Sequence, residues 1–212
     1  MKYFDFHLHS VGADSVFNVI IGKDEIPGSG YFTAGIHPWF IDHIADQLSE
    51  LKEIITHKNC IAIGECGLDR LKGPDISIQK DIFKSHIELA DDHKKPLIIH
   101  CVKAHNELLE IKKQSGSTVK WIVHGFNQNE TIARRLLEND FLFSLGKPLL
   151  HPDSNGSKVI KQVPLSRLFL ETDSAEVTIE EVYKAAAERL ALPMLDLSDN
   201  LQRNFQRIFL HE

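Results

Sequence analysis

A chain of 212 residues, 42% of them hydrophobic, can bury a full core, and we expect one globular domain over residues 1–212. Its net charge of −6 gives no overall electrostatic footprint for nucleic acid, although bound divalent cations would make a site locally positive. The sequence lacks both a signal segment and an apolar run near the roughly 20 residues of a membrane span, and its three cysteines suit reduced thiols, so we expect a cytoplasmic protein.

Short apolar runs alternate along the chain with stretches whose apolar residues recur at helical spacing. Eight candidate strands end near His9 or cover 16–21, 31–36, 60–64, 96–100, 120–124, 141–145 and 167–172. Helices are expected at 41–57, 76–93, 103–114, 128–139, 155–162, 178–191 and 197–210. This alternation predicts a parallel sheet, and eight units fit an α/β fold of the (β/α)8 TIM-barrel type, slightly smaller than usual.

The first connection departs from this pattern. Only a small polar segment separates His9 from the strand that begins at Val16, whereas parallel strands need a crossover of about a dozen residues or more. Either the second strand is irregular or the barrel lacks an early helix, and we expect the helix to be missing.

Potential metal ligands stand at the ends of five strands. His7 and His9 alternate along the first strand, so their imidazoles share one face. The ligands that close later apolar runs are Glu65, His100, His124 and Asp173. Barrel closure brings all strand ends around one centre, whereas an open doubly wound sheet, the competing architecture, would spread them along a line. The ligand positions therefore favour the barrel.

The four imidazoles and two carboxylates form a mixed nitrogen and oxygen donor set, which suits Zn²⁺, Mn²⁺ or a similar divalent ion such as Mg²⁺. One ion rarely needs six protein ligands if it is to keep a position open, but two ions sharing one carboxylate would use them all. Paired ions about 4 Å apart activate a water and clamp the attacking and leaving oxygens of a hydrolytic displacement. The donor set therefore predicts a hydrolase with two divalent metal ions.

Six motifs occur in a fixed order: DFHLH at 5–9, GIHPW at 35–39, AIGECGLD at 62–69, PLIIHCVKA at 96–104, VHGF at 123–126 and PLSRLFLETDS at 164–174. In these motifs the chain resembles the TatD-related metal-dependent deoxyribonucleases of the amidohydrolase superfamily. The closing segment 200–209 also looks like the family's ending, so the resemblance covers nearly the whole chain.

The resemblance implies roles for the matching residues. One metal would be held by His7, His9 and Asp173, a second completed by His100 and His124, with Glu65 bridging the two. Asp173 would also orient or deprotonate the nucleophilic water, which makes Glu65 and Asp173 the expected catalytic residues. The implied reaction is exonucleolytic hydrolysis of DNA, and we expect a monomer.

Four further residues lie in or near these motifs. Three of them have two interpretations each, and the fourth receives no catalytic role. His37 is expected to contact a substrate phosphate, or else to be a helix-entry residue held by hydrogen bonds. Lys103 is either a substrate-binding cation or a solvated surface lysine, and Trp39 either stacks on a base or caps the barrel mouth. Arg70 stands where the family usually has an aromatic residue, and we assign it no catalytic role.

Cys66 and Cys101 each adjoin a ligand in sequence. Neighbouring residues of a strand point to opposite faces, so both thiols should point away from the metals. We therefore predict that they are packing residues.

Departures from the family pattern leave the substrate open. The loop that ordinarily follows ETDS is missing, because residues after Asp173 run almost directly into a helix. A smaller phosphoester or another amidohydrolase-type substrate is the alternative to DNA. DFHLHS also resembles the opening of the polymerase and histidinol phosphatase family, although the later motifs match that family poorly. A metal-binding protein that has lost turnover is the third interpretation.

Overall fold

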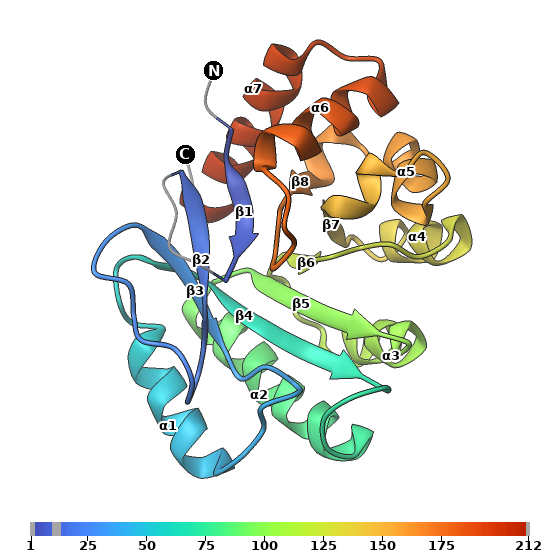
Figure 1. Ribbon diagram of the computed structural model, residues 1–212. Helices are drawn as coiled ribbons and strands as arrows, with labels where there is room; N and C mark the ends of the chain where they lie inside the picture. The colour runs from blue at the N-terminus through green and yellow to red at the C-terminus, as the bar shows by residue number, and fades with distance from the viewer. Residues whose placement is uncertain (1–2, 10–13, 211–212) are drawn as a thin grey trace. The chain divides into compact units, whose positions relative to one another are not determined.

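The computed structural model describes residues 3–9 and 14–210 (Figure 1). Its strands are β1 (Asp5–Leu8), β2 (Ser15–Ile20), β3 (Tyr31–Gly35), β4 (Cys60–Asp69), β5 (Leu97–Val102), β6 (Trp121–Val123), β7 (Leu142–Leu145) and β8 (Leu168–Leu170). Its α-helices are α1 (Ile44–Ile54), α2 (Ile76–His93), α3 (His105–Ser115), α4 (Glu130–Leu137), α5 (Asn155–Val159), α6 (Ile179–Leu190) and α7 (Met194–Phe205). Every predicted strand and helix is present.

The sheet follows the order of the chain. Neighbouring strands run from β1 to β8 in sequence order, and the pairings β3–β4, β4–β5 and β7–β8 are parallel. A parallel bridge between Leu8 and Asp173 places the end of β8 beside β1. This order, with the last strand next to the first, is that of a (β/α)8 barrel, and the predicted fold class is confirmed.

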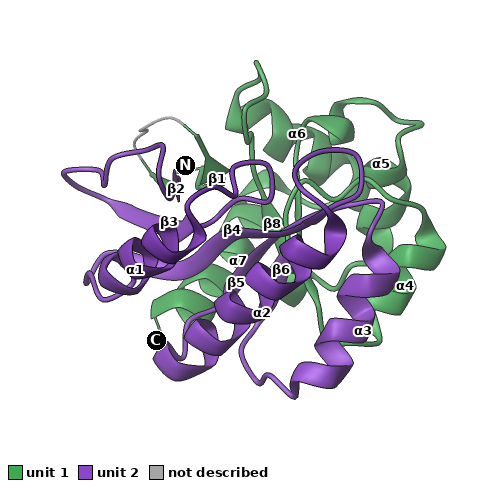
Figure 2. Cartoon of the chain, turned by 90° about the horizontal axis from the view of Figure 1, so that it is seen from below, with its two compact units in different colours: residues 1–16, 123–212 green, residues 17–122 purple. Residues whose placement is uncertain are grey.

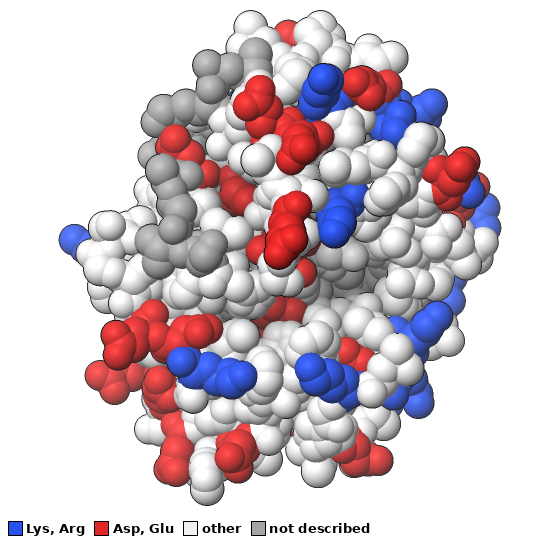
Figure 3. All heavy atoms as spheres, viewed as in Figure 1, with Lys and Arg blue, Asp and Glu red and all other residues white. Residues whose placement is uncertain are grey.

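The chain divides into two compact units, which Figure 2 colours separately. Unit 1 comprises residues 1–16 and 123–212, and unit 2 comprises residues 17–122. The single domain expected over residues 1–212 stays a prediction. Figure 3 shows that acidic and basic side chains of the described residues are interspersed on one face, as a modest negative net charge implies.

In unit 2, α2 packs on β4 through an apolar stripe that includes Ile82, Phe83 and Ile87. All of β4 is buried, and the ring of Phe83 meets Trp121 edge to face with centroids 5.4 Å apart. Burial of these aromatic and branched side chains supplies the apolar free energy of this unit.

In unit 1, an aromatic cluster joins the first strand to the end of the chain. The ring of Phe6 on β1 stacks on Phe169 of β8 at 4.4 Å, and Phe209 lies 5.6 Å and 5.7 Å from these two rings. Because Phe6 and His7 are neighbours on a strand, packing of Phe6 into the core directs His7 to the opposite face.

The boundaries differ from the predicted ones at informative places. β4 continues to Asp69 rather than ending at residue 64, because its backbone still pairs with β5 after the apolar run has stopped. Glu65 therefore lies within a strand. α7 begins at Met194, directly after Pro193, three residues earlier than predicted.

The two connections that departed from the family pattern have different outcomes. Residues 10–13, where the missing helix was expected, lie outside the described residues. After Asp173, α6 begins at Ile179 with Thr178 and Glu181 in a reciprocal capping box, so the connection is short as predicted. Within the described ranges, every helix is too short or too polar to cross a bilayer.

Candidate metal centre

In unit 1, three of the predicted ligands lie together. His7, His9 and Asp173 each offer one ligand atom within 4.8 Å of the others, and His9 Nε2 lies 3.2 Å from Asp173 Oδ1. The local fold produces this group: β1 places both imidazoles on one face, and the Asp173 N–H donates to the carbonyl oxygen of His7 at 3.0 Å.

Asp5, on the same strand as His7, holds the residue that precedes Asp173. Its carboxylate accepts the Thr172 N–H at 3.0 Å and the Thr172 hydroxyl at 2.6 Å. Burial raises the pKa of Asp5 to about 6, against the lowering effect of these hydrogen bonds. These two hydrogen bonds connect Thr172, the residue before Asp173, to Asp5 on β1. Asp5 is not among the predicted site residues, although it opens the DFHLH motif.

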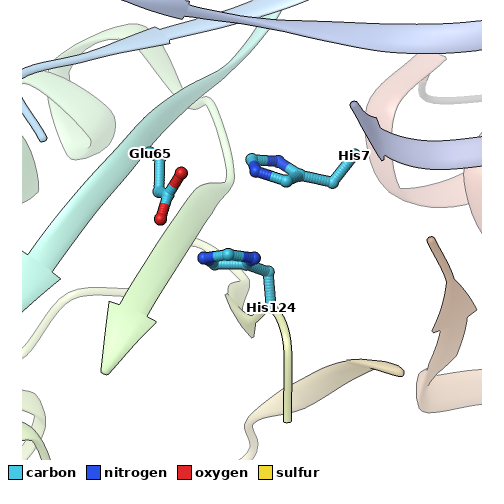
Figure 4. A group of neighbouring side chains, drawn as sticks. All are labelled: His7, Glu65 and His124. Atoms are coloured by element: carbon cyan, nitrogen blue, oxygen red, sulfur yellow. The ribbon is translucent and has the colours of Figure 1, made fainter. Parts of the chain in front are cut away.

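His124 follows β6 and lies beside His7, with ring centroids 4.4 Å apart. Figure 4 shows these two imidazoles and also labels Glu65 of β4. Glu171, which is 1% exposed, lies behind His124: its Oε1 is 3.5 Å from His124 Nδ1 and accepts the Gly125 N–H at 2.5 Å. The structure therefore places a buried carboxylate within ion-pair distance of the His124 ring.

In unit 2, Glu65 lies between two buried histidines. Glu65 Oε1 is 3.0 Å from His37 Nε2 and 2.8 Å from His100 Nδ1. These three side chains also offer ligand atoms within 4.8 Å of one another, and they are 2%, 4% and 9% exposed. The structure thus places His37 at Glu65, where the motif alone left its role open.

The hydrogen-bond partners of His37 determine its tautomer. The Trp39 N–H donates to His37 Nδ1 at 3.1 Å, so Nδ1 is the acceptor and the ring proton lies on Nε2. Nε2 then donates to Glu65. His37 is therefore a hydrogen-bond donor in this arrangement and not a free metal ligand.

Asn18 on β2, fully buried, orients Glu65. Its Oδ1 accepts the Glu65 N–H at 2.7 Å and the Thr33 hydroxyl at 3.0 Å, and its Nδ2 donates to Glu65 Oε2 at 3.4 Å. Asn18 is not among the predicted site residues. The available signal was a lone amide within the apolar run 16–21, which is costly to bury without partners.

Asp69, at the end of β4, holds the other side of His100. Its Oδ2 accepts from His100 Nε2 at 2.9 Å and from the Trp39 indole at 2.6 Å. Burial opposes ionisation of Asp69, but the hydrogen bonds from His100 and Trp39 outweigh it and lower the pKa of Asp69. The far nitrogen of His100 is thereby fixed, and Nδ1 is directed to Glu65. Trp39 is thus part of the hydrogen-bonded group.

Two glycines on either side of Glu65 allow the backbone of β4 to lie close to that of β5. Gly64 and Gly67 adopt φ of +137° and +136°, and a Cβ there would meet the carbonyl oxygens of Ile98 and His100. The GECG sequence therefore combines the ligand with the two residues that allow close backbone approach.

The remaining candidates are not members of the ligand groups found among the described residues. Lys103 follows β5, is exposed and has φ of +54°. Burial raises the pKa of Cys66 well above its usual value and that of Cys101 to about 12. Neither thiol belongs to the ligand groups found among the described residues, which fits their interpretation as packing residues.

Comparison with known proteins identifies the family of this chain. A family profile described as "TatD related DNase" matches residues 13–210. The uncharacterized metal-dependent hydrolase YabD of Bacillus subtilis is 35% identical over 153 residues, which are 70% of this chain and 60% of the relative. A putative deoxyribonuclease, the TATDN1 homolog of Vairimorpha ceranae, is 30% identical over 154 residues, 72% of this chain and 55% of the relative.

This chain therefore spans about three fifths of the length of these relatives. Among solved structures, YjjV, a TatD homolog from Escherichia coli, superposes with a TM-score of 0.80 at 19% identity. That superposition covers 98% of this chain and 97% of YjjV, so the two share the fold.

Proposed function

Because the chain belongs to the TatD-related DNase family, we propose that it is a metal-dependent hydrolase that cleaves phosphodiester bonds in DNA as an exonuclease. The observation that carries the proposal is the presence, in each unit, of imidazoles and a carboxylate whose ligand atoms lie within 4.8 Å of one another. A small phosphoester is the alternative substrate, since the loop after Asp173 is short. A monomeric, cytoplasmic enzyme is part of the same proposal.

The described residues fit divalent ions. The group in unit 1 offers two imidazole nitrogens and a carboxylate oxygen, and in unit 2 His100 turns Nδ1 toward Glu65 while Asp69 holds Nε2. A carboxylate on the far nitrogen is the usual support of a metal-binding histidine. When bound, two divalent ions lower the pKa of a water and neutralise charge that develops on the phosphoryl oxygens.

We assign the ligands as the motifs imply. His7, His9 and Asp173 would hold one ion, His100 and His124 would hold the other, and Glu65 would serve both. The Asp173 side chain is 38% exposed, whereas that of Glu65 is 2% exposed. Of the two predicted catalytic carboxylates, Asp173 is therefore the one that can reach water and accept its proton.

Two residues are assigned to substrate. The Nε2–H of His37 donates to Glu65 in this structure, and the same proton can be offered to a phosphoryl oxygen. Lys103 is an exposed cation one residue beyond β5, the strand that carries His100.

Hydrolysis of a short single-stranded DNA and of a small chromogenic phosphodiester, side by side, tests the proposal. We expect stepwise shortening of the DNA with added Mg²⁺, Mn²⁺ or Zn²⁺ and none with chelator. Turnover of the small ester alone would overturn DNA as the substrate and leave a metal-dependent phosphoesterase.

Substitution of the two carboxylates tests the residues. Glu65→Gln and Asp173→Asn should each lower kcat by about 100-fold or more, since each removes a charged ligand at the reacting centre. Circular dichroism should show that both variants keep the fold. Glu50→Gln, an exposed change on α1, is the matched control and should keep full activity. Normal activity of either site variant would contradict the assignment.

A further inference from the structure

The loop 70–75, between β4 and α2, begins directly after Asp69, whose side chain accepts the hydrogen bond from His100 Nε2. Gln79, 1% exposed, fixes the inside of this loop. Its side chain donates to the carbonyl oxygens of Asp69, Lys72 and Pro74 at 2.9, 3.3 and 2.8 Å, and it accepts the Asp69 N–H at 2.7 Å. One buried amide thus forms four hydrogen bonds with the backbone of Asp69 and the loop, and these bonds fix the conformation of the loop.

A second contact fixes the loop from outside. Arg70 Nε donates to Glu107 Oε1 of α3 at 2.8 Å. This pairing lowers the pKa of Glu107, against partial burial. Arg70 is therefore committed to a protein carboxylate, in agreement with the absence of a catalytic assignment for it.

The loop surrounds a hollow of about 280 Å³ that is lined by residues 69–76. Asp69 belongs to this lining and also accepts the hydrogen bond from His100 Nε2. The hollow thus adjoins the ligand group of unit 2 through a single side chain.

Lys72 supplies a positive charge at this hollow. Its Nζ lies 3.6 Å from the centroid of the Trp39 ring, and among the described residues it forms no ion pair. An ammonium on an aromatic face is held in place but not neutralised. Trp39 is in turn fixed by its indole N–H on Asp69.

The two carboxylates of the lining are already engaged. Asp69 accepts from His100, Trp39 and the N–H groups of Leu71 and Lys72. Asp75 caps α2, where it accepts the N–H and the hydroxyl of Ser77 at 2.8 and 2.6 Å. The hollow therefore combines a cation that pairs with no carboxylate of the described residues and two acids that already have hydrogen-bond donors, which favours an anionic ligand.

We propose that Lys72, held on Trp39, binds a phosphate of the nucleic acid strand next to the phosphodiester that is cleaved. This inference rests on the proposed function and deepens it, because it assigns a second phosphate subsite. A cation beside an aromatic ring is a common way to hold single-stranded nucleic acid.

Binding in the absence of metal tests the inference without turnover. The anisotropy of a labelled single-stranded oligonucleotide, measured with chelator over a range of salt, should show about fivefold weaker binding by Lys72→Ala. The salt slope should fall by about 0.7, the value for one phosphate contact on a single strand. Lys72→Arg should bind as the unchanged protein does, and Lys72→Glu should bind more weakly than Lys72→Ala. Lys52→Ala, an exposed change on α1, is the matched control.

Kinetics supply the second measurement. Loss of a flanking phosphate contact should raise KM for the oligonucleotide by about fivefold, because it is made equally in the ground and transition states. A small phosphodiester has no second phosphate, so its kcat/KM should fall less. Equal losses on both substrates, or identical DNA binding by Lys72→Ala and Lys52→Ala, would overturn the inference.

These outcomes separate the inference from the proposed function. If the unchanged protein degrades DNA while Lys72 has no effect, only the subsite is wrong. If the unchanged protein binds DNA through Lys72 but never hydrolyses it, the nuclease proposal is wrong and the phosphate contact remains.

Discussion

His86 on α2 holds the backbone of the GIHPW motif from behind. Its Nε2 accepts the Ile36 N–H at 2.9 Å, and its Nδ1 lies 2.8 Å from the Ile82 carbonyl oxygen. The first contact requires a lone pair on Nε2, so the ring is neutral with its proton on Nδ1. Burial lowers the pKa of His86 to about 4, against the hydrogen bond to Ile82.

A pH dependence of stability follows from this shift. Between the ordinary pKa of 6.5 and about 4, unfolded His86 binds a proton and folded His86 does not, so this contribution to stability falls as pH falls. The full loss is about 3 kcal/mol. The stability advantage over His86→Gln should therefore shrink by up to that amount from pH 7 to pH 4 in denaturant titrations.

The exposed change His43→Gln is the control, because its side chain is 79% exposed. Its unfolding free energy should track that of the unchanged protein across the same pH range. Parallel curves for the unchanged protein and His86→Gln would refute the assigned protonation state.

The polar residues that sequence analysis missed share one property. Asn18, Asp69 and Glu171 act on partners far away along the chain: Glu65, His100 and Gly125. A lone amide in an apolar run, as at Asn18, indicates only that the side chain needs a partner if it is buried, and the types and spacing of Asp69 and Glu171 do not show which partner each has. Only the contact identifies the role.

β4 is the element that most depends on its exact residues. Gly67 of β4 pairs with His100 of β5. The two backbones lie so close at this point that a Cβ on Gly67 would meet the His100 carbonyl oxygen. The apolar pattern ended at Ile63, so periodicity alone placed the strand end too early. Backbone pairing, which side-chain polarity does not report, carries the strand on to Asp69.

Gly67→Ala should therefore destabilise the protein by about 2 kcal/mol or more. The residue has φ of +136°, and the added Cβ would meet the carbonyl oxygen of His100. The free energy of unfolding in urea measures this change. Gly28→Ala, at an exposed glycine with no atom within 4 Å of the added Cβ, should change it by less than about 0.5 kcal/mol. Equal effects of the two changes would show that the close approach is unimportant.

At the scale of the whole molecule, metal binding should contribute to stability. Each unit contains a ligand group, and the proposed function has divalent ions bound by these ligands. An ion that binds only the folded chain stabilises it by about 2.7 kcal/mol at 100 times its Kd.

Addition of Mn²⁺ or Zn²⁺ to chelated protein should raise Tm, and chelator should reverse the shift. Glu65→Gln should reduce the shift, whereas Glu50→Gln should leave it intact. The absence of a shift with Mg²⁺, Mn²⁺ and Zn²⁺ would count against a divalent metal centre.

The order of strands, helices and ligand-bearing motifs was readable from the sequence, because apolar periodicity and strand-end position are local properties of the chain. The family and the barrel fold follow from that order. The tertiary structure decided which ligands lie together within each unit, that His37 donates to Glu65, and that Asn18 and Asp69 hold Glu65 and His100 by hydrogen bonds. It also placed Lys72 on Trp39. These contacts join residues that are distant in sequence, and the relative placement of strands and loops sets them, which no local pattern encodes.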